Sequence, residues 1–137
     1  MSKIVLRTTA RPMTNNPEDI IRWVCVELGF SSGLEEDTAV EKMLEELAEA
    51  ARDSRGLTSS ELQKDKELAR STIIYHLNRF MDCGLVVKQG RHYYLRAMEL
   101  SRAIEEIEYD MQKEMQKMID TAKEFDKEMS TRLKPKR

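Results

Sequence analysis

The chain has 137 residues, of which 40% are hydrophobic, 35% are charged and 6% are aromatic, and its formal net charge is −2. This composition is typical of a helix-rich globular domain with an extension, and it excludes a disordered chain. The apolar runs are too short for a membrane span, and the N-terminus lacks the long apolar stretch of a secretory signal. We therefore expect a cytoplasmic protein without a membrane contact.

The cysteines and the catalytic residue types give no sign of a reaction centre. Cys25 and Cys83 are far apart and belong to no metal-ligand spacing, so we expect two reduced thiols. No nucleophile with a neighbouring base and no glycine-rich phosphate loop is recognisable. The sequence therefore predicts no enzyme, no metal site and no cofactor.

Residues 1–33 predict an N-terminal arm and one helix, which is a candidate for a dimer contact. Asn16 is a suitable N-cap, Pro17 suits the first helical position, and Gly29 is a natural stop. Trp23 either packs into that contact or is partly exposed, and the sequence leaves both open. The apolar stripe of this helix consists of Ile20, Ile21, Val24, Cys25 and Leu28.

A second helix is predicted from Thr38 to about Arg55. Thr38 and Glu41 have the spacing of a capping box. Residues 34–56 carry eight acidic and three basic side chains, so we expect this helix to stay away from phosphate. Its predicted outer face consists of Glu41, Glu45, Glu46 and Glu49.

Residues 57–96 predict a short helix, a turn, a second helix and a hairpin, and they form the one clearly basic block, with seven basic and four acidic side chains. Together with the helix at 38–55 they define a predicted domain at 34–96. Thr58 and Glu61 form a capping box for a helix at 59–66, and Ser71 is predicted to cap a helix over 72–83. The hairpin is expected to turn at Gln89 and Gly90.

The helix at 72–83 has an apolar face and a polar face. Ile73, Ile74, Leu77, Phe80 and Met81 form the first, and Thr72, Tyr75, His76 and Arg79 form the second. The polar side chains have the chemistry to reach base edges or phosphates, and a helix N-terminus also suits a phosphate. The alternative is a solvated face, because any amphipathic helix of a small domain presents one.

The segment ELQKDKELARSTIIYHLNRFMDCGLVVKQGRHYYLR resembles the winged helix-turn-helix of the ArsR and MarR families of bacterial and archaeal regulators. The matching residues are Glu61, Leu62, Leu68, Arg70, Ser71, Thr72, His76, Leu77, Gly84, Leu85, Val86, Tyr93 or Tyr94, and Leu95. The resemblance implies a mainly α fold with a small β-wing, in which the helix at 71–83 enters the DNA major groove and the wing at 85–95 contacts the backbone. The polar face of the helix, its N-terminus and the tip of the wing together supply the predicted DNA-binding residues, which are Arg70, Ser71, Thr72, Tyr75, His76, Arg79, Lys88 and Arg91.

The chain departs from the family pattern in the turn and in the wing. Lys66 and Glu67 stand where the family often has an apolar residue followed by glycine. We expect Lys66 to bury its stem and keep its charge in water, and Glu67 predicts a longer or partly helical turn. The wing is short, with Lys88 and Arg91 near its tip.

Residues 97–137 predict one long helix, about 50 Å in length, that ends in a basic tail. A small domain cannot cover its apolar stripe, so we expect a homodimer. An eleven-residue repeat indicates a nearly straight or slightly right-handed coiled coil. The alternatives are a helix folded over its own domain and a methionine-rich groove for a small-molecule effector, which nothing further supports. The predicted dimer seam consists of Leu100, Ile104, Ile107, Met111, Met115, Met118, Ala122, Phe125, Met129 and Leu133.

These patterns favour a homodimeric transcriptional regulator that binds double-stranded DNA sequence-specifically. Two-fold symmetry then predicts a roughly palindromic site with half-sites about 34–36 Å apart, or a multiple of that distance. The alternative is a winged-helix protein-interaction module, such as a chromosome or transcription-machinery scaffold without sequence readout.

Overall fold

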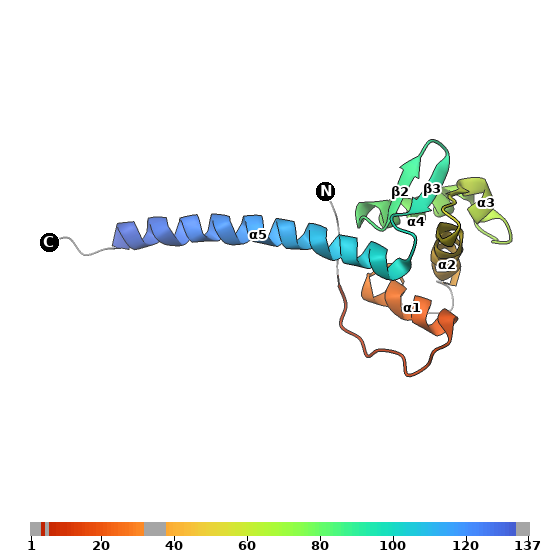
Figure 1. Cartoon of the computed structure of the whole chain (residues 1–137), viewed down its shortest axis with the longest axis horizontal. Helices are drawn as coiled ribbons and strands as arrows, with labels where there is room; N and C mark the ends of the chain where they lie inside the picture. Colours follow the sequence, from red (N-terminus) through yellow and green to blue (C-terminus); the bar gives the residue numbers. More distant parts are fainter. Residues whose placement is uncertain (1–3, 5, 32–37, 134–137) are drawn as a thin grey trace. The chain divides into compact units, whose positions relative to one another are not determined.

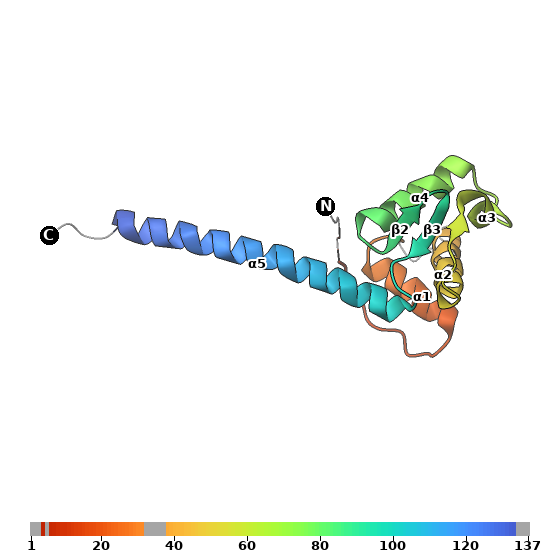
Figure 2. The ribbon, with the colours of Figure 1, turned by 45° about the horizontal axis from the view of Figure 1, so that its top comes forward.

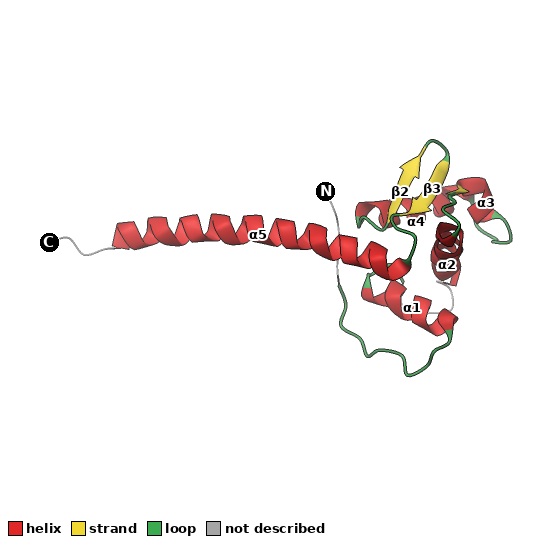
Figure 3. Cartoon of the chain, viewed as in Figure 1, coloured by secondary structure: helices red, strands yellow, loops and turns green. Residues whose placement is uncertain are grey.

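The computed structural model describes residue 4, residues 6–31 and residues 38–133, and within them the chain is mainly helical with a small antiparallel sheet (Figures 1 and 3). It divides into two units, Met1–Ile104 and Glu105–Arg137. The elements in chain order are α1 (Pro17–Glu27), α2 (Thr38–Arg52), β1 (Leu57–Thr58), α3 (Ser59–Gln63), α4 (Arg70–Asp82), β2 (Val86–Gln89), β3 (His92–Leu95) and α5 (Leu100–Leu133). None of these helices has the length and apolar character that crossing a bilayer requires.

Helix α1 begins and ends as predicted, and the arm before it lies along its C-terminal end. The Asn16 side chain accepts a hydrogen bond from the backbone N–H of Glu18 at 2.9 Å. Gly29 ends the helix with a positive φ of 79°. The backbone N–H of Arg7 donates to the carbonyl of Glu27 at 3.0 Å. Hydrogen bonding therefore fixes the arm, although its described residues form no strand.

Helix α2 differs from the prediction at its start. Thr38 is the first helical residue rather than the cap, and the position before it lies outside the described residues. Glu41 is only 5% exposed, so the prediction that it lies on the outer face is wrong. Its carboxylate accepts from Arg22 Nε at 3.1 Å and from the Ser31 hydroxyl at 3.5 Å. Glu41 therefore joins α1, the following loop and α2, which satisfies its buried charge.

The hydrophobic core of the first unit lies between α1, α2, α3, α4 and the sheet. On α4, Ile73, Leu77 and Phe80 are fully buried at helical spacing, and the Phe80 ring packs edge-to-face on Phe30 with centroids 4.9 Å apart. Each such side chain contributes about 1.5–3 kcal/mol to folding by leaving water. The other large, fully buried residues are Cys25, Met43, Leu44, Leu47, Leu62, Cys83 and Leu85.

The predicted hairpin is confirmed, with its turn one residue later than expected. Val86 pairs with Leu95 and Gln89 pairs with His92, which leaves Gly90 and Arg91 as the turn. Gly90 has a φ of 62°, as a tight hairpin turn requires. The strand order is β1-β3-β2, in which β1 was not predicted. Strand β2 contacts α4 and β3 contacts α2, as Figure 2 shows.

The predicted caps of the two helices before the hairpin are confirmed only in part. The capping box of α3 is present, because Thr58 Oγ1 accepts from the N–H of Glu61 at 3.1 Å and the Glu61 carboxylate accepts from the N–H of Thr58 at 2.9 Å. These bonds lower the pKa of Glu61. The predicted cap at Ser71 is wrong, since α4 begins at Arg70 after Ala69, which makes no side-chain cap bond.

The turn between α3 and α4 places Lys66 in the interior. Its side chain is only 3% exposed, and its ammonium donates to the Glu46 carboxylate and to the carbonyl of Leu62. The prediction that this charge stays in water is therefore wrong. Asp65 is the residue of the turn that adopts the left-handed conformation, with a φ of 65°. The turn therefore does not require Glu67 to adopt it.

We predict that Gly56→Ala destabilises the first unit by about 1–3 kcal/mol, because the added methyl overpacks its site. A Cβ on Gly56 would lie 2.7 Å from Cε2 and Cζ of Tyr94 and 2.9 Å from the carbonyl oxygen of Tyr93. Chemical denaturation measures the change. Gly90→Ala is the control, since its Cβ meets nothing within 4 Å and only backbone strain is added. A wild-type unfolding midpoint for Gly56→Ala would contradict the close approach of Tyr94.

Candidate nucleic-acid interface

Helix α4 and the β2–β3 hairpin carry all of the predicted DNA-binding residues. The structure divides these residues by exposure. Arg70, Ser71, Tyr75, Lys88 and Arg91 are exposed, whereas Thr72, His76 and Arg79 are half-buried. Only the exposed group presents its side chains freely to a partner molecule.

The start of α4 is suited to an anion. Helix α4 has no acidic residue in its first turn and no side-chain cap, so no carboxylate of the helix itself offsets the positive end of its dipole. The Arg70 guanidinium is exposed at the same end and donates to the hydroxyl of Ser60 on α3. This bond joins the two helices and holds a positive charge beside the helix N-terminus.

The exposed face of α4 is rotated by about one residue from the predicted face. Ser71, Tyr75, Asn78 and Asp82 are its exposed residues, at spacings of four, three and four. Tyr75 is 57% exposed, and its ring lies edge-to-face against His76 with centroids 5.4 Å apart. The sequence prediction missed Asn78. A signal for it was present, because Ser71, Tyr75 and Asn78 lie opposite the fully buried Ile73 and Leu77.

Arg79 is held by the protein rather than presented to solvent. Its guanidinium donates to the carbonyl of Gly29 and, at 3.3 Å, to the carbonyl of Phe30. Its carbon Cζ lies 5.7 Å from the centroid of the Phe30 ring and 5.8 Å from that of Tyr75. Arg79 therefore connects α4 to the loop after α1, and its guanidinium is not presented for contact with a base.

The hairpin forms a small positive surface beside α4. Residues 83–98 contain Lys88, Arg91 and Arg96 and no acidic residue. The Lys88 ammonium lies 5.3 Å from the centroid of the Tyr93 ring on the neighbouring strand, which orients the lysine across the hairpin. Arg91 is exposed in the turn itself. The hairpin thus carries two exposed cations without a competing carboxylate in its own strands.

Helix α2 has the opposite charge, as expected. Glu45, Glu46 and Glu49 remain at least partly exposed, and Glu46 pairs with Lys66. Partial burial, followed by the nearby charge of Glu49, raises the pKa of Glu45. This acidic surface disfavours phosphate, so the candidate interface is confined to α4 and the hairpin.

The predicted dimer seam has three kinds of environment. Leu100, Ile104, Met111 and Met129 are half-buried, and Ile107 is buried. In the second unit, Met115, Met118 and Phe125 are 51%, 58% and 64% exposed, and Ala122 is exposed as well. Ile119, also exposed, lies beside them and was not predicted. The long helix is confirmed, and much of its apolar row lies open to water within that unit.

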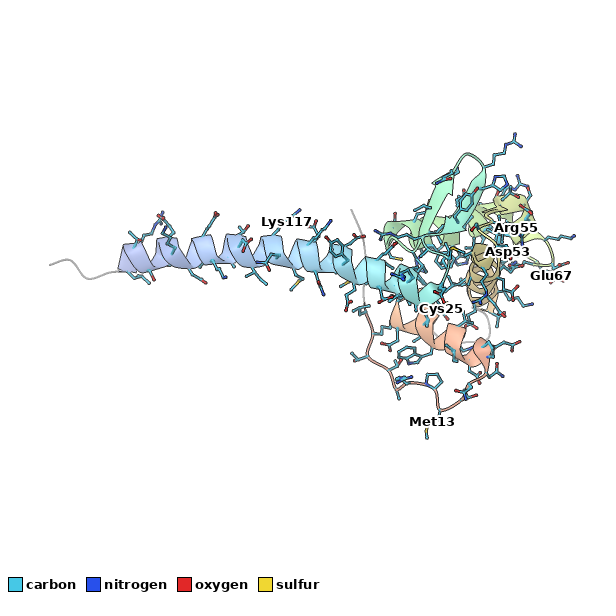
Figure 4. The ribbon with its side chains drawn as sticks, in the orientation of Figure 1. Met13, Cys25, Asp53, Arg55, Glu67 and Lys117 are labelled. Carbon is cyan, nitrogen blue, oxygen red and sulfur yellow. The ribbon has the colours of Figure 1, made fainter. Side chains whose placement is uncertain are left out.

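Neither the cysteines nor the other ligand residues of the described ranges form a metal site. Within those ranges, no group of three or more His, Cys, Asp and Glu side chains is placed to hold a metal ion. Both cysteines are free and buried, and Figure 4 shows Cys25 on α1 within the first unit. Burial raises the pKa of Cys25 to about 12 and that of Cys83 to about 11.

The chain matches no protein-family model, no curated protein and no solved structure. Its function is therefore inferred from the side chains themselves and from the motif in residues 61–96. The relevant features are the exposed face of α4, the positive hairpin and the apolar row of α5.

We predict that Arg79→Ala lowers the free energy of unfolding by about 1–3 kcal/mol, because the carbonyls of Gly29 and Phe30 lose their donor. Denaturant titration followed by circular dichroism measures the loss. Asn78→Ala is the matched control on the same helix, and we expect it to stay within about 0.5 kcal/mol of wild type. Equal stability of the two variants would contradict the role given to Arg79.

We predict that both thiols resist alkylation in the native protein at pH 8, because their raised pKa values keep them protonated. Unfolded chains, with ordinary thiol pKa values near 9, should react readily. The same shift stabilises the fold below about pH 9, and that contribution is lost as the pH rises toward 11 and 12. Mass spectrometry after iodoacetamide treatment measures the labelling. Rapid native labelling of Cys25 would contradict its burial.

Proposed function

We propose that the chain is a homodimeric winged-helix transcriptional regulator that binds duplex DNA. Helix α4 enters the major groove, the β2–β3 hairpin acts as the wing on the adjacent backbone, and α5 joins two copies. The observation that carries this proposal is the exposed face of α4, whose acid-free N-terminus lies in the same unit as a hairpin without carboxylates. The motif resemblance to the ArsR and MarR regulators supports the same function.

The residues of the interface divide into two roles. Arg70, Lys88 and Arg91 are cations suited to phosphate, which fixes position and supplies most of the affinity. Tyr75 and Asn78 on the exposed face of α4 are suited to base edges or methyl groups, which supplies sequence preference. The exposed Ser71 hydroxyl and the positive end of the α4 dipole add to phosphate binding at the helix N-terminus. Half-buried His76 supports the ring of Tyr75.

The location and chemistry follow from the same proposal. Two free, buried thiols are typical of the cytoplasm, where disulfides are rare. A regulator of this kind is not an enzyme and needs no cofactor. Because the net charge is −2, we expect one copy to bind DNA only weakly and without sequence preference. Affinity would then depend on two copies that bind together.

We predict that the double variant Lys88→Ala, Arg91→Ala weakens duplex binding about tenfold or more. It should also reduce the slope of log K against log salt by about 2, because about one counterion per lost phosphate contact is no longer released. Fluorescence anisotropy with labelled duplex at several salt concentrations measures both. Lys42→Ala on α2 is the control, since it removes an exposed lysine from the acidic helix.

Two results would contradict the proposal. If the wing variant and wild type bind duplex with the same affinity and slope, the hairpin is not a DNA contact. If selection from a random duplex pool yields no enriched sequence, or Tyr75→Ala leaves an enriched sequence unchanged, α4 does not read bases. Failure of sequence selection would favour the alternative, a winged-helix scaffold for protein interaction.

A further inference from the structure

The apolar row of the second unit has a defined centre. Between Met111 and Leu133 its seven residues follow at steps of four, three, four, three, four and four, and Ala122 is the fourth. Exposed apolar patches of this length mark interaction surfaces. A second copy is the occupant that the charges beside the row favour.

Two ion pairs lie on one side of this row. Glu114 pairs with Lys117 at 3.0 Å, and Glu128 pairs with Arg132 at 3.3 Å, each within the helix. Glu114 and Arg132 are eighteen residues apart, which is five helical turns, and Lys117 and Glu128 are eleven apart, about three turns. All four side chains therefore follow the same flank of α5, and Figure 4 shows Lys117 projecting from the helix.

The order of negative and positive charges along this flank distinguishes parallel from antiparallel pairing of two α5 helices. If a second α5 runs in the opposite direction with Ala122 opposite Ala122, Lys117 faces Glu128 of the other copy. Glu114 then lies within about two residues of the other copy's Arg132. The flank is thus complementary to itself after reversal, and each pair occurs twice by symmetry.

The distribution of charge along α5 and its tail favours an antiparallel pair. Residues 105–116 carry five acidic side chains and one basic side chain, whereas residues 123–137 carry three acidic and six basic ones. A parallel pair would align the acidic segment with itself, which is unfavourable. An antiparallel pair aligns it with the basic segment.

The apolar row also packs well in the reversed register. Met118 falls opposite Phe125, Met115 opposite Met129, and Met111 opposite Leu133. A flexible methionine beside an aromatic ring gives a favourable sulfur contact. In a parallel pair the two Phe125 rings would meet at the same level.

We propose that two copies of α5 pair antiparallel through the row from Met111 to Leu133, with Ala122 on the two-fold axis. This pairing rests on the homodimer of the proposed function and specifies its orientation and register. Because the first unit of each copy continues into the N-terminal end of α5, the attachment points lie at opposite ends of the pair. The two Glu105 residues would be about 50 Å apart at 1.5 Å per residue.

Cysteine cross-linking of the full chain tests the orientation. The double variant Met115→Cys, Met129→Cys should give a covalent dimer under mild oxidation, because the two positions face each other. Each single variant should stay unlinked, because its two copies are about 20 Å apart, far beyond the reach of a disulfide. Wild type is the control, since Cys25 and Cys83 are buried.

Charge reversal tests the register without replacing the apolar row. The variant Glu114→Lys, Lys117→Glu keeps its ion pair within the helix but places like charges opposite Arg132 and Glu128 of the other copy. We expect the dimer dissociation constant, measured by analytical ultracentrifugation, to rise on the order of tenfold. Adding Glu128→Lys and Arg132→Glu should restore it to within about threefold. Circular dichroism verifies that each variant remains helical.

The outcomes separate this pairing from DNA binding. Cross-linking by the single variants, or a charge-reversed protein that dimerises like wild type, overturns the antiparallel register and leaves the regulator intact. A wild-type monomer at micromolar concentration overturns the pairing and the proposed homodimer together. An intact antiparallel dimer that does not bind duplex overturns only the proposed DNA function.

Discussion

Burial of Ile73, Leu77 and Phe80 fixes the rotation of α4 about its axis, and the contacts available to that helix depend on this rotation. A helix can turn about its axis without changing its hydrogen bonds, so only side-chain packing determines which face points outward. With these three residues inside, Ser71, Tyr75 and Asn78 are outside. The candidate interface is therefore a consequence of the core.

Several charged residues act inside the first unit as connections between distant segments. Arg79 joins α4 to the loop after α1, Glu41 joins α2 to Arg22 and Ser31, and Lys66 joins the turn to Glu46. Each satisfies backbone or side-chain groups that would be costly to leave unpaired away from water. Because Lys66 and Arg79 are engaged inside the unit, the number of basic residues in 57–96 overstates the positive charge that is available to a nucleic acid.

The second unit presents the opposite situation, since its helix has an apolar row that its own residues cannot cover. A single helix makes no core, and a partner surface would stabilise such a row in water. The self-complementary order of Glu114, Lys117, Glu128 and Arg132 makes a second copy a suitable partner. A dimer would also present two copies of the first unit, which would compensate for the low positive charge of each copy.

The sequence by itself determined the features that depend on neighbouring residues. The Asn16 cap, the Thr58–Glu61 capping box, the hairpin and the continuous α5 followed from patterns within a few residues, because helix caps and tight turns are local structures. The exposed members of the candidate site, such as Tyr75, Lys88 and Arg91, were also found from local pattern.

Only the tertiary structure decided the features that join distant parts of the chain. The pairing of β1 with β3, the interior positions of Glu41 and Lys66, and the partners of Arg79 involve residues that are 19 to 50 positions apart or belong to separate elements. A long charged side chain has the same sequence pattern whether it reaches solvent or a buried carbonyl. The choice depends on which backbone groups the fold brings within its reach, and that is a property of packing rather than of local sequence.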